Sequence, residues 1–591
     1  MTARQHQRHA SLHAFRHTLK ATSLAAMITY VALSLASALA GGVAAVLLVP
    51  LVQPGHALVL GGRTFDVQGG IEAHAAIFAA VTLVFALLRW QAARLAARLA
   101  SGYGMDLRRA VHARLIDASL ASLADASSAE IANVLTYNVE IITQGFSALL
   151  QLLVAGMTAA ISLVLAFWVS PPLALAAPVL ALLAVAASRI SSRAQSAVSR
   201  QYVADLTRLF WHSEDFPRRL RHVRSFGREQ AEKDSYGDIA ARLGYGYRHQ
   251  LDLIASGRLT LELLAAAGIA AIFILAYRLP GVDQASLIAV CLLLGRLLPY
   301  LVSTRQSFQQ LHSAVPAFEL WQRYMKLDGA YLSRAKAAAV HATKSLHIER
   351  VQLAPPLSAL DIRDVSLLPG TLTLVWGESG IGKSSLVDVL AGMMWPVAFA
   401  ARMDGRALDF AAYRELVRHG AYVSQSVRPW QGTVRECLRW AAPDATDAML
   451  HDALADVGLD KRLASSPDGL DTALNSASSR FSGGELQRLL LAQVILRQPF
   501  IALLDEATSA LDAASEMAVL SALKRRLPET ILIVVSHRGS VVAMADQYID
   551  IGADFVAAVR KASGLPRRHS RESDTVALVA SEQHGLPLPR E

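Results

Sequence analysis

The sequence predicts a multi-domain chain in which an all-α domain with six membrane-spanning helices precedes an α/β domain. The length of 591 residues exceeds what one compact domain needs. Hydrophobic residues make up 53% of the chain and the mean hydropathy is +0.34, values that are high for a soluble protein. After about Leu311 the long apolar runs give way to alternating strand and helix patterns.

The charge and the cysteines exclude several classes of protein. The net charge is +9, but the excess arginine lies beside apolar runs, so we expect no nucleic-acid partner. Cys291 lies in an apolar run and Cys437 in the second half, which makes a disulfide framework implausible. No cysteine and histidine spacing typical of a metal site occurs, and we predict no structural metal.

The first predicted span lies between Ala21 and Gly55, where no residue is charged. About 20 apolar residues suffice to cross a bilayer. A signal peptide is the alternative, because residues 37–40 resemble a cleavage site. The apolar run continues through Val52, beyond a normal signal core, which favours an uncleaved span.

Five further spans follow. One lies near residues 73–90, two lie within 141–188 on either side of Ser170-Pro171-Pro172, and the last two lie near 254–277 and 284–303. The connections 54–72, 171–172 and 278–283 are poor in Lys and Arg, whereas 89–140 and 189–253 are long and rich in Arg. This asymmetry predicts a multi-pass protein of the cytoplasmic membrane with both termini and both long connections in the cytoplasm. Helical apolar spacing continues through the long connections, so we expect them to extend the membrane helices.

A phosphate-binding pattern opens the second half. A strand at Leu372–Trp376 runs into a glycine-rich loop, and a helix pattern follows at Leu386–Met393. Strand, glycine loop and helix in this order indicate a P-loop, because loop N–H groups and a helix N-terminus surround phosphates. A chance glycine-rich turn is the alternative, and the flanking elements disfavour it. The predicted ATP contacts are Gly377, Glu378, Ser379, Gly380, Ile381, Gly382, Lys383, Ser384 and Ser385.

Two carboxylates follow a second buried strand pattern at Phe500–Leu504. We predict that Asp505 and the Ser384 hydroxyl hold Mg²⁺ and that Glu506 polarises the attacking water. A solvated strand end is the alternative, and it is disfavoured downstream of a P-loop. The α/β half is therefore predicted to be a P-loop ATPase domain that uses ATP and Mg²⁺.

Ordered motifs around these residues resemble those of the ABC transporters. Phe481–Arg488 resembles the ABC signature motif, and Ser509–Asp512 resembles the D-loop. Gln425 and His537 correspond to the Q-loop glutamine and the switch histidine. Six spans followed by this domain is the layout of a type I exporter, so the resemblance covers the whole chain.

The resemblance implies a dimer in which each ATP lies between the P-loop of one subunit and the signature motif of the other. Ser482, Gly483 and Gly484 then contact nucleotide in trans. Gln425 touches Mg²⁺ and the loop interface, and His537 stabilises the γ-phosphate and the attacking water. No catalytic position is degenerate, which favours a homodimer over the alternative, a heterodimer.

Three segments depart from the family pattern. Residues 351–356 contain no aromatic side chain to stack on adenine, so stacking is weakened or supplied elsewhere. Glu485 stands where Gln is commoner. Residues 475–477 replace an acidic stretch that exporters often carry, which puts that contact to the loops in doubt.

Arg296 lies inside the last predicted span, where a charge costs at least about 2.5 kcal/mol unless it faces a cavity or a partner. One hypothesis is that it lines the transport path and attracts an anionic substrate. The alternatives are that it pairs with Glu262 or extends towards the cytoplasm. Pro299 is expected to kink this helix.

The predicted function is ATP-driven export by alternating access. The cargo favoured is a small, modified antimicrobial peptide, with a lipid, a drug or a siderophore-like metabolite as alternatives. An ATP-gated channel is disfavoured by Glu506 and His537, and a soluble ABC ATPase conflicts with six spans. The predicted divisions are a cytoplasmic segment 1–20, a membrane domain 21–311, a linker 312–344, a nucleotide-binding domain 345–558 and a disordered tail 559–591.

Overall fold

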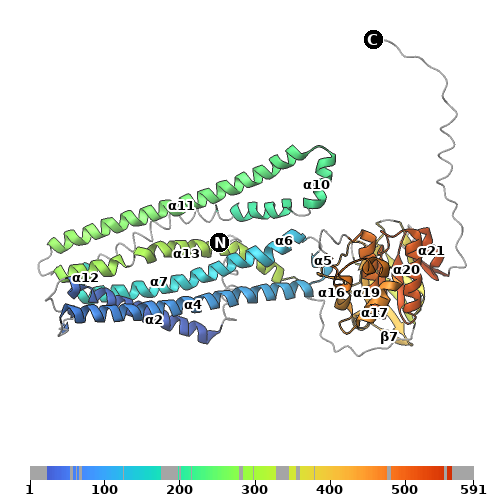
Figure 1. Cartoon of the computed structure of the whole chain (residues 1–591), viewed down its shortest axis with the longest axis horizontal. Helices are drawn as coiled ribbons and strands as arrows, with labels where there is room; N and C mark the ends of the chain where they lie inside the picture. Colours follow the sequence, from blue (N-terminus) through green and yellow to red (C-terminus); the bar gives the residue numbers. More distant parts are fainter. Residues whose placement is uncertain are drawn as a thin grey trace, which may run out of the picture. The chain divides into compact units, whose positions relative to one another are not determined.

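The computed structural model describes residues 23–52, 58–60, 63–65, 70–123, 126–174, 198, 201–213, 216–278, 284–296, 298–327, 345–354, 360–378, 380–474, 481–551 and 556–561. The chain divides into two compact units, one formed by residues 1–118 and 122–330, the other by 119–121 and 331–591. Each unit is described by itself (Figure 1). The predicted segment 1–20 lies outside the described residues, and so does most of the predicted tail.

The first unit is helical apart from one small hairpin. Its elements are α2 (Leu24–Leu47), α3 (Val49–Val52), β1 (Leu58–Leu60), β2 (Arg63–Phe65), α4 (Ile71–Asp117), α6 (Ser128–Asn133), the π-helix η1 (Val134–Asn138), α7 (Val139–Val169), α8 (Pro171–Ala174), α10 (Phe216–Ser225), α11 (Glu229–Arg278), α12 (Gln284–Gly295) and α13 (Leu298–Met325), and the short helix α5 (Leu120–Leu123) follows α4. Strands β1 and β2 pair antiparallel within the predicted connection 54–72.

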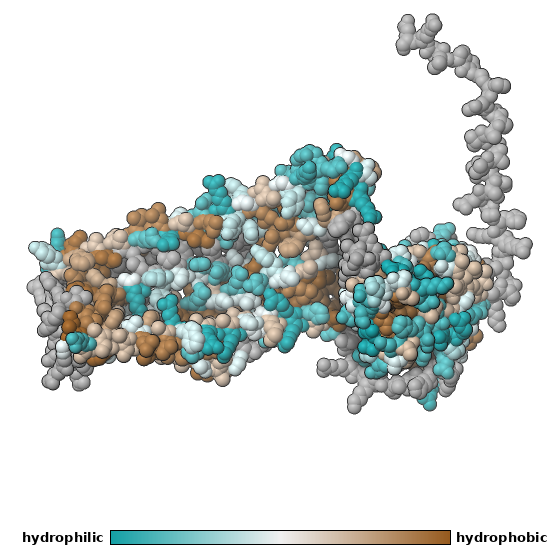
Figure 2. All heavy atoms as spheres, viewed as in Figure 1, coloured by the Kyte–Doolittle hydropathy of each residue, from teal (hydrophilic) through white to brown (hydrophobic). Residues whose placement is uncertain are grey.

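Four helical stretches of the described chain are long and apolar enough to cross a membrane, namely 24–51, 71–117, 128–169 and 229–278. Helices α4 and α11 continue far beyond their apolar parts, as the pattern predicts. The predicted span after Pro172 lies mostly outside the described residues. In Figure 2, apolar side chains gather over α12 and the end of α11, whereas hydrophilic side chains cover α10. Large apolar side chains such as Leu83, Leu263 and Phe273 are exposed, as lipid-facing residues are.

The last predicted span is described as two helices, and Leu297 between them lies outside the described residues. Helix α12 ends at Gly295 and α13 begins at Leu298, directly before Pro299. Proline lacks the backbone N–H that would bond the carbonyl of Gly295, and its ring clashes with that carbonyl. Arg296 forms a turn directly after the end of α12.

Helix α13 continues to Met325, so the predicted start of a linker at residue 312 is wrong. Ala317, Phe318, Trp321 and Tyr324 are buried in the core of the helical unit. Their spacing places them on one face of the helix, and α13 packs along α7 through that face. Because these side chains are buried, the helix continues past the end of the apolar run.

The second unit is built on a ten-stranded mixed sheet of order β7-β6-β3-β4-β12-β11-β5-β10-β9-β8. The strands are β3 (Leu346–Gln352), β4 (Asp361–Leu367), β5 (Leu372–Gly377), β6 (Ala398–Met403), β7 (Arg406–Leu408), β8 (Ala421–Ser424), β9 (Ile501–Asp505), β10 (Ile531–Val535), β11 (Gln547–Ile551) and β12 (Val556–Lys561). The helices are α14 (Lys383–Leu390), α15 (Phe410–Val417), α16 (Val434–Ala441), α17 (Asp447–Asp456), α18 (Asp460–Ala464), α19 (Gly483–Arg497), α20 (Ala513–Arg526) and α21 (Gly539–Met544), with the 3₁₀ turn η2 (Gly469–Asp471).

The centre of this sheet is parallel and buried on both faces. Along the order β11-β5-β10-β9-β8, each strand runs parallel to the next. Alternate residues of β5 enter different cores, since Leu372 and Leu374 belong to one cluster and Val375 to the other. Continuous burial of β9 and β10 agrees with their unbroken apolar sequences.

The final strand, β12, corrects the predicted end of the domain. It pairs antiparallel with β11 as far as Lys561, opposite Gln547. The sheet thus extends past residue 558, where the mixed composition gave no strand signal.

Candidate nucleotide-binding site

The register of the parallel strands aligns the predicted motifs along one edge of the sheet. Ser424, Asp505, Val535 and Val375 lie opposite one another across β8, β9, β10 and β5. All four strands end at this edge, and ligands of open α/β sheets bind at the carboxyl ends of strands. The P-loop, the Q-loop, the paired carboxylates and the switch histidine therefore each follow a strand end at the same edge.

The P-loop follows β5 directly. Gly377 has φ +155°, and a Cβ atom there would lie 2.8 Å from the carbonyl oxygen of Ile551. Gly382, with φ +103°, is the N-cap of α14. Only glycine adopts both conformations without strain, and the loop N–H groups are then available to phosphate.

Lys383 reaches back over this loop. Its Nζ donates to the carbonyl oxygens of Gly377 at 3.1 Å and Glu378 at 2.7 Å. Burial lowers the pKa of the Lys383 ammonium, and the charges of Glu506 and Asp505 partly offset this effect. The Lys383 ammonium is thus held over the loop, where it can contact a bound phosphate.

The remaining predicted P-loop contacts lie on the same loop and the first turn of α14, with Ser384 exposed. Ser379 lies outside the described residues. Val351 and Leu353 are buried in the segment where the family's adenine-stacking aromatic would stand, so neither side chain is available to nucleotide.

The two carboxylates differ in their surroundings. Asp505 is buried, whereas Glu506 lies one residue beyond the strand with φ +52°. The Glu506 N–H donates to the carbonyl of Val535, which holds this left-handed conformation. The Glu506 carboxylate lies 3.8 Å from Nε2 of His537. The predicted base and the predicted switch histidine are therefore neighbours.

A third carboxylate, Asp388, was missed by sequence reasoning. It lies on α14, and burial together with the charge of Asp505 raises its pKa, while a hydrogen bond from Tyr422 acts against this. Burial and the two carboxylates raise the pKa of Tyr422 to about 12. The helix spacing alone gave no sign that Asp388 would lie near Asp505.

The signature motif forms the N-terminus of α19. The Ser482 hydroxyl accepts the Glu485 N–H at 3.2 Å, and the Glu485 carboxylate accepts the Ser482 N–H at 2.6 Å. This reciprocal capping box gives a structural reason for the glutamate that departs from the family pattern. The Ser482 hydroxyl proton remains available to an incoming oxygen.

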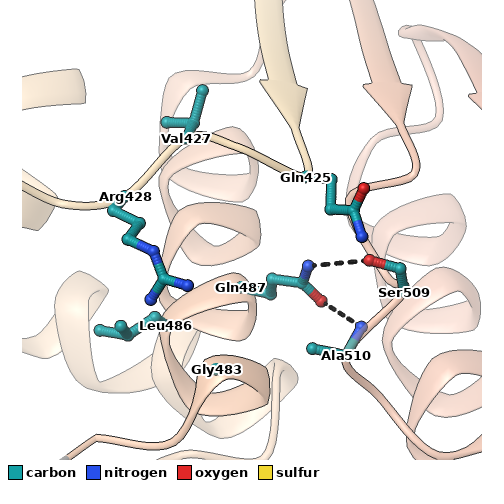
Figure 3. Close-up of a pocket in the computed structure, with 8 residues that line it drawn as sticks. All are labelled: Gln425, Val427, Arg428, Gly483, Leu486, Gln487, Ser509 and Ala510. Carbon is teal, nitrogen blue, oxygen red and sulfur yellow. Dashed lines mark hydrogen bonds between the residues drawn. The ribbon is translucent and has the colours of Figure 1, made fainter. Parts of the chain in front are cut away.

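A cavity of about 210 Å³ lies between the Q-loop, α19 and the D-loop (Figure 3). Its lining residues are Gln425, Val427, Arg428, Gly483, Leu486, Gln487, Ser509 and Ala510. The backbone N–H of Gln425 donates to the Asp505 carbonyl at 3.0 Å, which fixes the start of the Q-loop beside β9. In Figure 3 the side chain of Gln425 points towards Ser509.

Gln487 ties the D-loop to the signature helix. Its side-chain amide donates to Ser509 Oγ at 3.3 Å, and its carbonyl accepts the Ala510 N–H at 2.9 Å, as Figure 3 shows. Gly484 packs so closely that a Cβ atom there would lie 2.9 Å from the Ala510 carbonyl oxygen. The two segments are therefore expected to move together.

Arg538 holds the D-loop from the other side. Its guanidinium donates to the carbonyls of Ser509, at 2.6 Å, and Leu511. The fully buried Glu516 accepts from Thr508 at 2.6 Å and lies 3.6 Å from Arg538. Sequence reasoning missed Gln487, Arg538 and Glu516, because no spacing rule places these contacts.

The alternative in which Arg296 pairs with Glu262 is wrong. Glu262 lies 2.7 Å from Arg258, one turn earlier on α11. Arg296 instead donates weakly to the carbonyl of Ala38, at 3.4 Å, and its guanidinium lies 5.1 Å from the ring centroid of Phe85. A salt bridge within one helix needs no approach of α12, which accounts for the difference.

A P-loop, paired carboxylates and a signature helix, on a chain that also carries membrane-length helices, define a membrane-embedded ATPase. Comparison with family models agrees. A model described as ABC transporter matches residues 360–509, and one described as ABC transporter transmembrane region matches residues 31–279. The chain belongs to the ABC transporter family, with the fused layout of a type I exporter. As in that family, it binds ATP and couples its hydrolysis to transport across a membrane.

Several curated proteins are similar to the chain. The heterocyst differentiation ATP-binding protein HepA of Nostoc sp. is 25% identical over 460 residues, 75% of this chain and 74% of that protein. The ATP-dependent lipid A-core flippase of Ralstonia nicotianae is 28% identical over 466 residues, 75% of this chain and 77% of the flippase. The mycobactin import ATP-binding/permease protein IrtA of Mycolicibacterium smegmatis is 38% identical over 195 residues, 33% of this chain and 23% of that protein.

A solved structure shares the fold. The structure of a bacterial Atm1-family ABC exporter with ATP bound has a TM-score of 0.75 and 19% identity, and covers 96% of this chain and 99% of its own. At that identity the likeness concerns the fold, which agrees with a helical membrane region followed by an α/β domain.

Proposed function

We propose that the chain works as a homodimer in the cytoplasmic membrane and exports an amphipathic compound from the cytoplasm. The observation that carries this proposal is the complete catalytic set at one sheet edge, with Lys383, Asp505 and the Glu506–His537 pair together. A chain that only bound nucleotide would not need a base held in a left-handed conformation beside a histidine.

The residues present fit a magnesium ion. Ser384, Asp505 and Gln425 offer hydroxyl, carboxylate and amide oxygens, which are the donors that Mg²⁺ prefers. No cluster of three His, Cys, Asp or Glu side chains occurs among the described residues, so a site of those side chains alone is not offered there. Bound Mg²⁺ would neutralise charge on the phosphate oxygens.

The proposed chemistry needs one proton acceptor. The water oxygen forms a bond to the γ-phosphorus while the Glu506 carboxylate takes its proton. The bond from the γ-phosphorus to the bridging oxygen breaks, and its electrons leave with ADP. Lys383 and the loop N–H groups stabilise the charge on the phosphates, and His537 donates to the γ-phosphate.

The signature motif supports the dimer. Ser482 already uses its oxygen to cap α19, so its hydroxyl proton and the N–H groups of the helix start can meet the γ-phosphate of a facing subunit. Closure then depends on the γ-phosphate, and hydrolysis removes that attraction. Gln487 and Arg538 both bond to the D-loop, so they would transmit the movement of closure between Ser482 and His537.

The similar proteins guide the proposal for the cargo, and the fused domain layout guides the proposal for the direction of transport. Among the similar proteins, one is a lipid A-core flippase and another a mycobactin importer, so an amphipathic cargo is consistent with both. We place a small modified peptide first and a lipid second, and we place the cargo path outward because the fused layout is that of exporters.

Transport in inside-out vesicles tests this function. Purified protein is reconstituted, and uptake of labelled peptides and lipids is followed with ATP, with ADP, and with Glu506→Gln protein as the matched control. We expect uphill accumulation that needs both ATP and Glu506. Passive flux supported by bound but unhydrolysed ATP would instead identify a gated channel and contradict the proposal.

A further inference from the structure

The helical unit holds more positive than negative charge within its predicted spans. Glu262 is the only Asp or Glu in the six spans, whereas Arg258 and Arg296 lie within them and Arg89 lies where the second span meets the connection 89–140. Arg258 already pairs with Glu262 at 2.7 Å. The spans therefore contain no carboxylate for Arg89 or Arg296.

Arg296 lies in a notch made by small residues. A Cβ atom on Gly41 would stand 2.0 Å from Nη2 and 2.5 Å from Cζ of Arg296, so the guanidinium lies directly on the backbone of α2. The neighbouring Gly42 has Leu165 as its nearest contact and Arg296 only at 3.7 Å. Any side chain at position 41 would thus force the guanidinium away.

The guanidinium is incompletely satisfied in this notch. Its Nη1 donates to the Ala38 carbonyl at 3.4 Å, Phe85 of α4 covers the guanidinium at 5.1 Å, and the Tyr300 side chain of α13 also interacts with it. Its Nη2 is buried, and among the described residues it has no hydrogen-bond partner. A planar guanidinium with free N–H groups matches carboxylate and phosphate oxygens.

A second cation lies nearby. Arg89 is one helical turn from Phe85 on α4, on the same face as the ring that covers the Arg296 guanidinium. Two cations without a carboxylate in the spans favour an anion.

We propose that Arg296, seated between Gly41 and Phe85, binds the anionic head group of the transported amphiphile. The head group is a carboxylate or a phosphate. Its negative charge balances the positive charge that the spans carry. This inference rests on the proposed transport function and adds the class of substrate. Without cargo, the Arg296 guanidinium stays in the notch. A bound anion then replaces its weak hydrogen bond to the Ala38 carbonyl.

Binding without ATP tests the site separately from the ATPase. The protein is placed in nanodiscs of zwitterionic phosphatidylcholine, and a fluorescent dodecyl phosphate is titrated. Dodecyl phosphate, dodecanoate, dodecyl maltoside and dodecyltrimethylammonium, which share one alkyl chain, then compete for it. We expect the anionic probes to compete at least about tenfold better than the neutral and cationic ones. The stronger of the two anionic probes identifies phosphate or carboxylate cargo.

Three variants make the test specific. Arg296→Gln should lose the preference for anions, and Arg296→Lys should keep part of it. Gly41→Ala should weaken it although the charge remains, because the added methyl displaces the guanidinium. Gly156→Ala, whose Cβ would meet nothing within 4 Å, is the matched control and should leave it unchanged.

The outcomes are separable from those of the transport proposal. Equal competition by all four probes, or an unchanged preference in Arg296→Gln protein, would overturn the anion site. Normal ATPase activity alongside either result would leave the transport function standing. Anion-selective binding by wild-type protein that never hydrolyses ATP would support the site and contradict the transport proposal.

Discussion

Glu506 and His537 carry the chemistry at the scale of single residues. Glu506 is held beyond the end of β9 by one backbone hydrogen bond, and its carboxylate lies 3.8 Å from His537. Glu506→Gln keeps the size of the side chain but cannot accept the proton of the attacking water. We expect kcat for ATP hydrolysis to fall by about 10²–10⁴-fold while ATP binding persists. Radiolabelled phosphate release and nucleotide-binding titrations measure the two effects.

Asp388 gives a prediction for pH dependence. Its folded pKa is raised, mainly by burial and then by Asp505, so the native state binds this proton more tightly than the unfolded state. The ionised carboxylate therefore destabilises the folded protein at neutral pH, and the penalty fades as pH falls through the raised pKa. Asp388→Asn should raise the thermal midpoint of nucleotide-free protein at pH 7.5, and the gain should shrink towards pH 4.5.

The exposed Asp444 is the control for this measurement. Asp444→Asn should give the same small change at both pH values. A gain for Asp388→Asn that is equal at pH 7.5 and pH 4.5 would contradict the electrostatic origin of the effect.

The catalytic residues could be predicted from the sequence because each follows a strand pattern at a fixed offset. Lys383, Asp505 and Glu506 belong to local motifs whose chemistry depends on a few neighbouring positions. Asp388 and Arg538 could not be predicted in the same way. Their importance comes from contacts between elements, and helix periodicity does not reveal such contacts.

The D-loop connection acts at the scale of elements. Gln487→Leu removes both hydrogen bonds that join α19 to Ser509 and Ala510. With each of the two bonds contributing about 1 kcal/mol, we expect the maximal ATPase rate to fall roughly 30-fold and the KM for ATP to change little. Steady-state kinetics on reconstituted protein measure both quantities.

Gln487→Glu is the conservative comparison. It keeps the oxygen that accepts the Ala510 N–H but loses the donor to Ser509, so its rate should be intermediate. If the leucine variant hydrolysed ATP at the wild-type rate, the D-loop would not depend on this link.

The cap of α19 also belongs to this scale. Glu485→Gln keeps an acceptor for the Ser482 N–H, whereas Glu485→Ala removes it. The alanine variant should lose about 0.5–2 kcal/mol of stability and the glutamine variant less. Chemical unfolding followed by the far-ultraviolet signal compares them, and equal losses would show that the reciprocal cap is not formed.

Elements with strong periodicity could be placed from the sequence, and those that depend on neighbours could not. The apolar runs of α2, α4, α7 and α11 and the buried strand β9 follow directly from composition. The extension of α13 to Met325 needs aromatic burial against other helices. The strand β12 needs its partner β11, so its residues alone carried no signal.

At the scale of the whole molecule, the account depends on two subunits sharing each nucleotide. The P-loop and its carboxylates lie at the strand edge, and the signature helix presents Ser482 from its own N-terminus. Each subunit would supply half of two sites. Anionic cargo at Arg296 would then be moved by the closing and opening of these shared sites.

Complementation between two inactive chains tests this claim most directly. We expect Lys383→Ala and Ser482→Ala proteins each to be inactive on their own, and a tandem fusion joins one copy of each. If ATP lies between a P-loop and the facing signature motif, the fusion contains one intact site, and ATPase activity should return well above that of either parent. If each chain instead completed its own site, both sites of the fusion would be defective. A fusion no more active than its parents would therefore contradict the shared site.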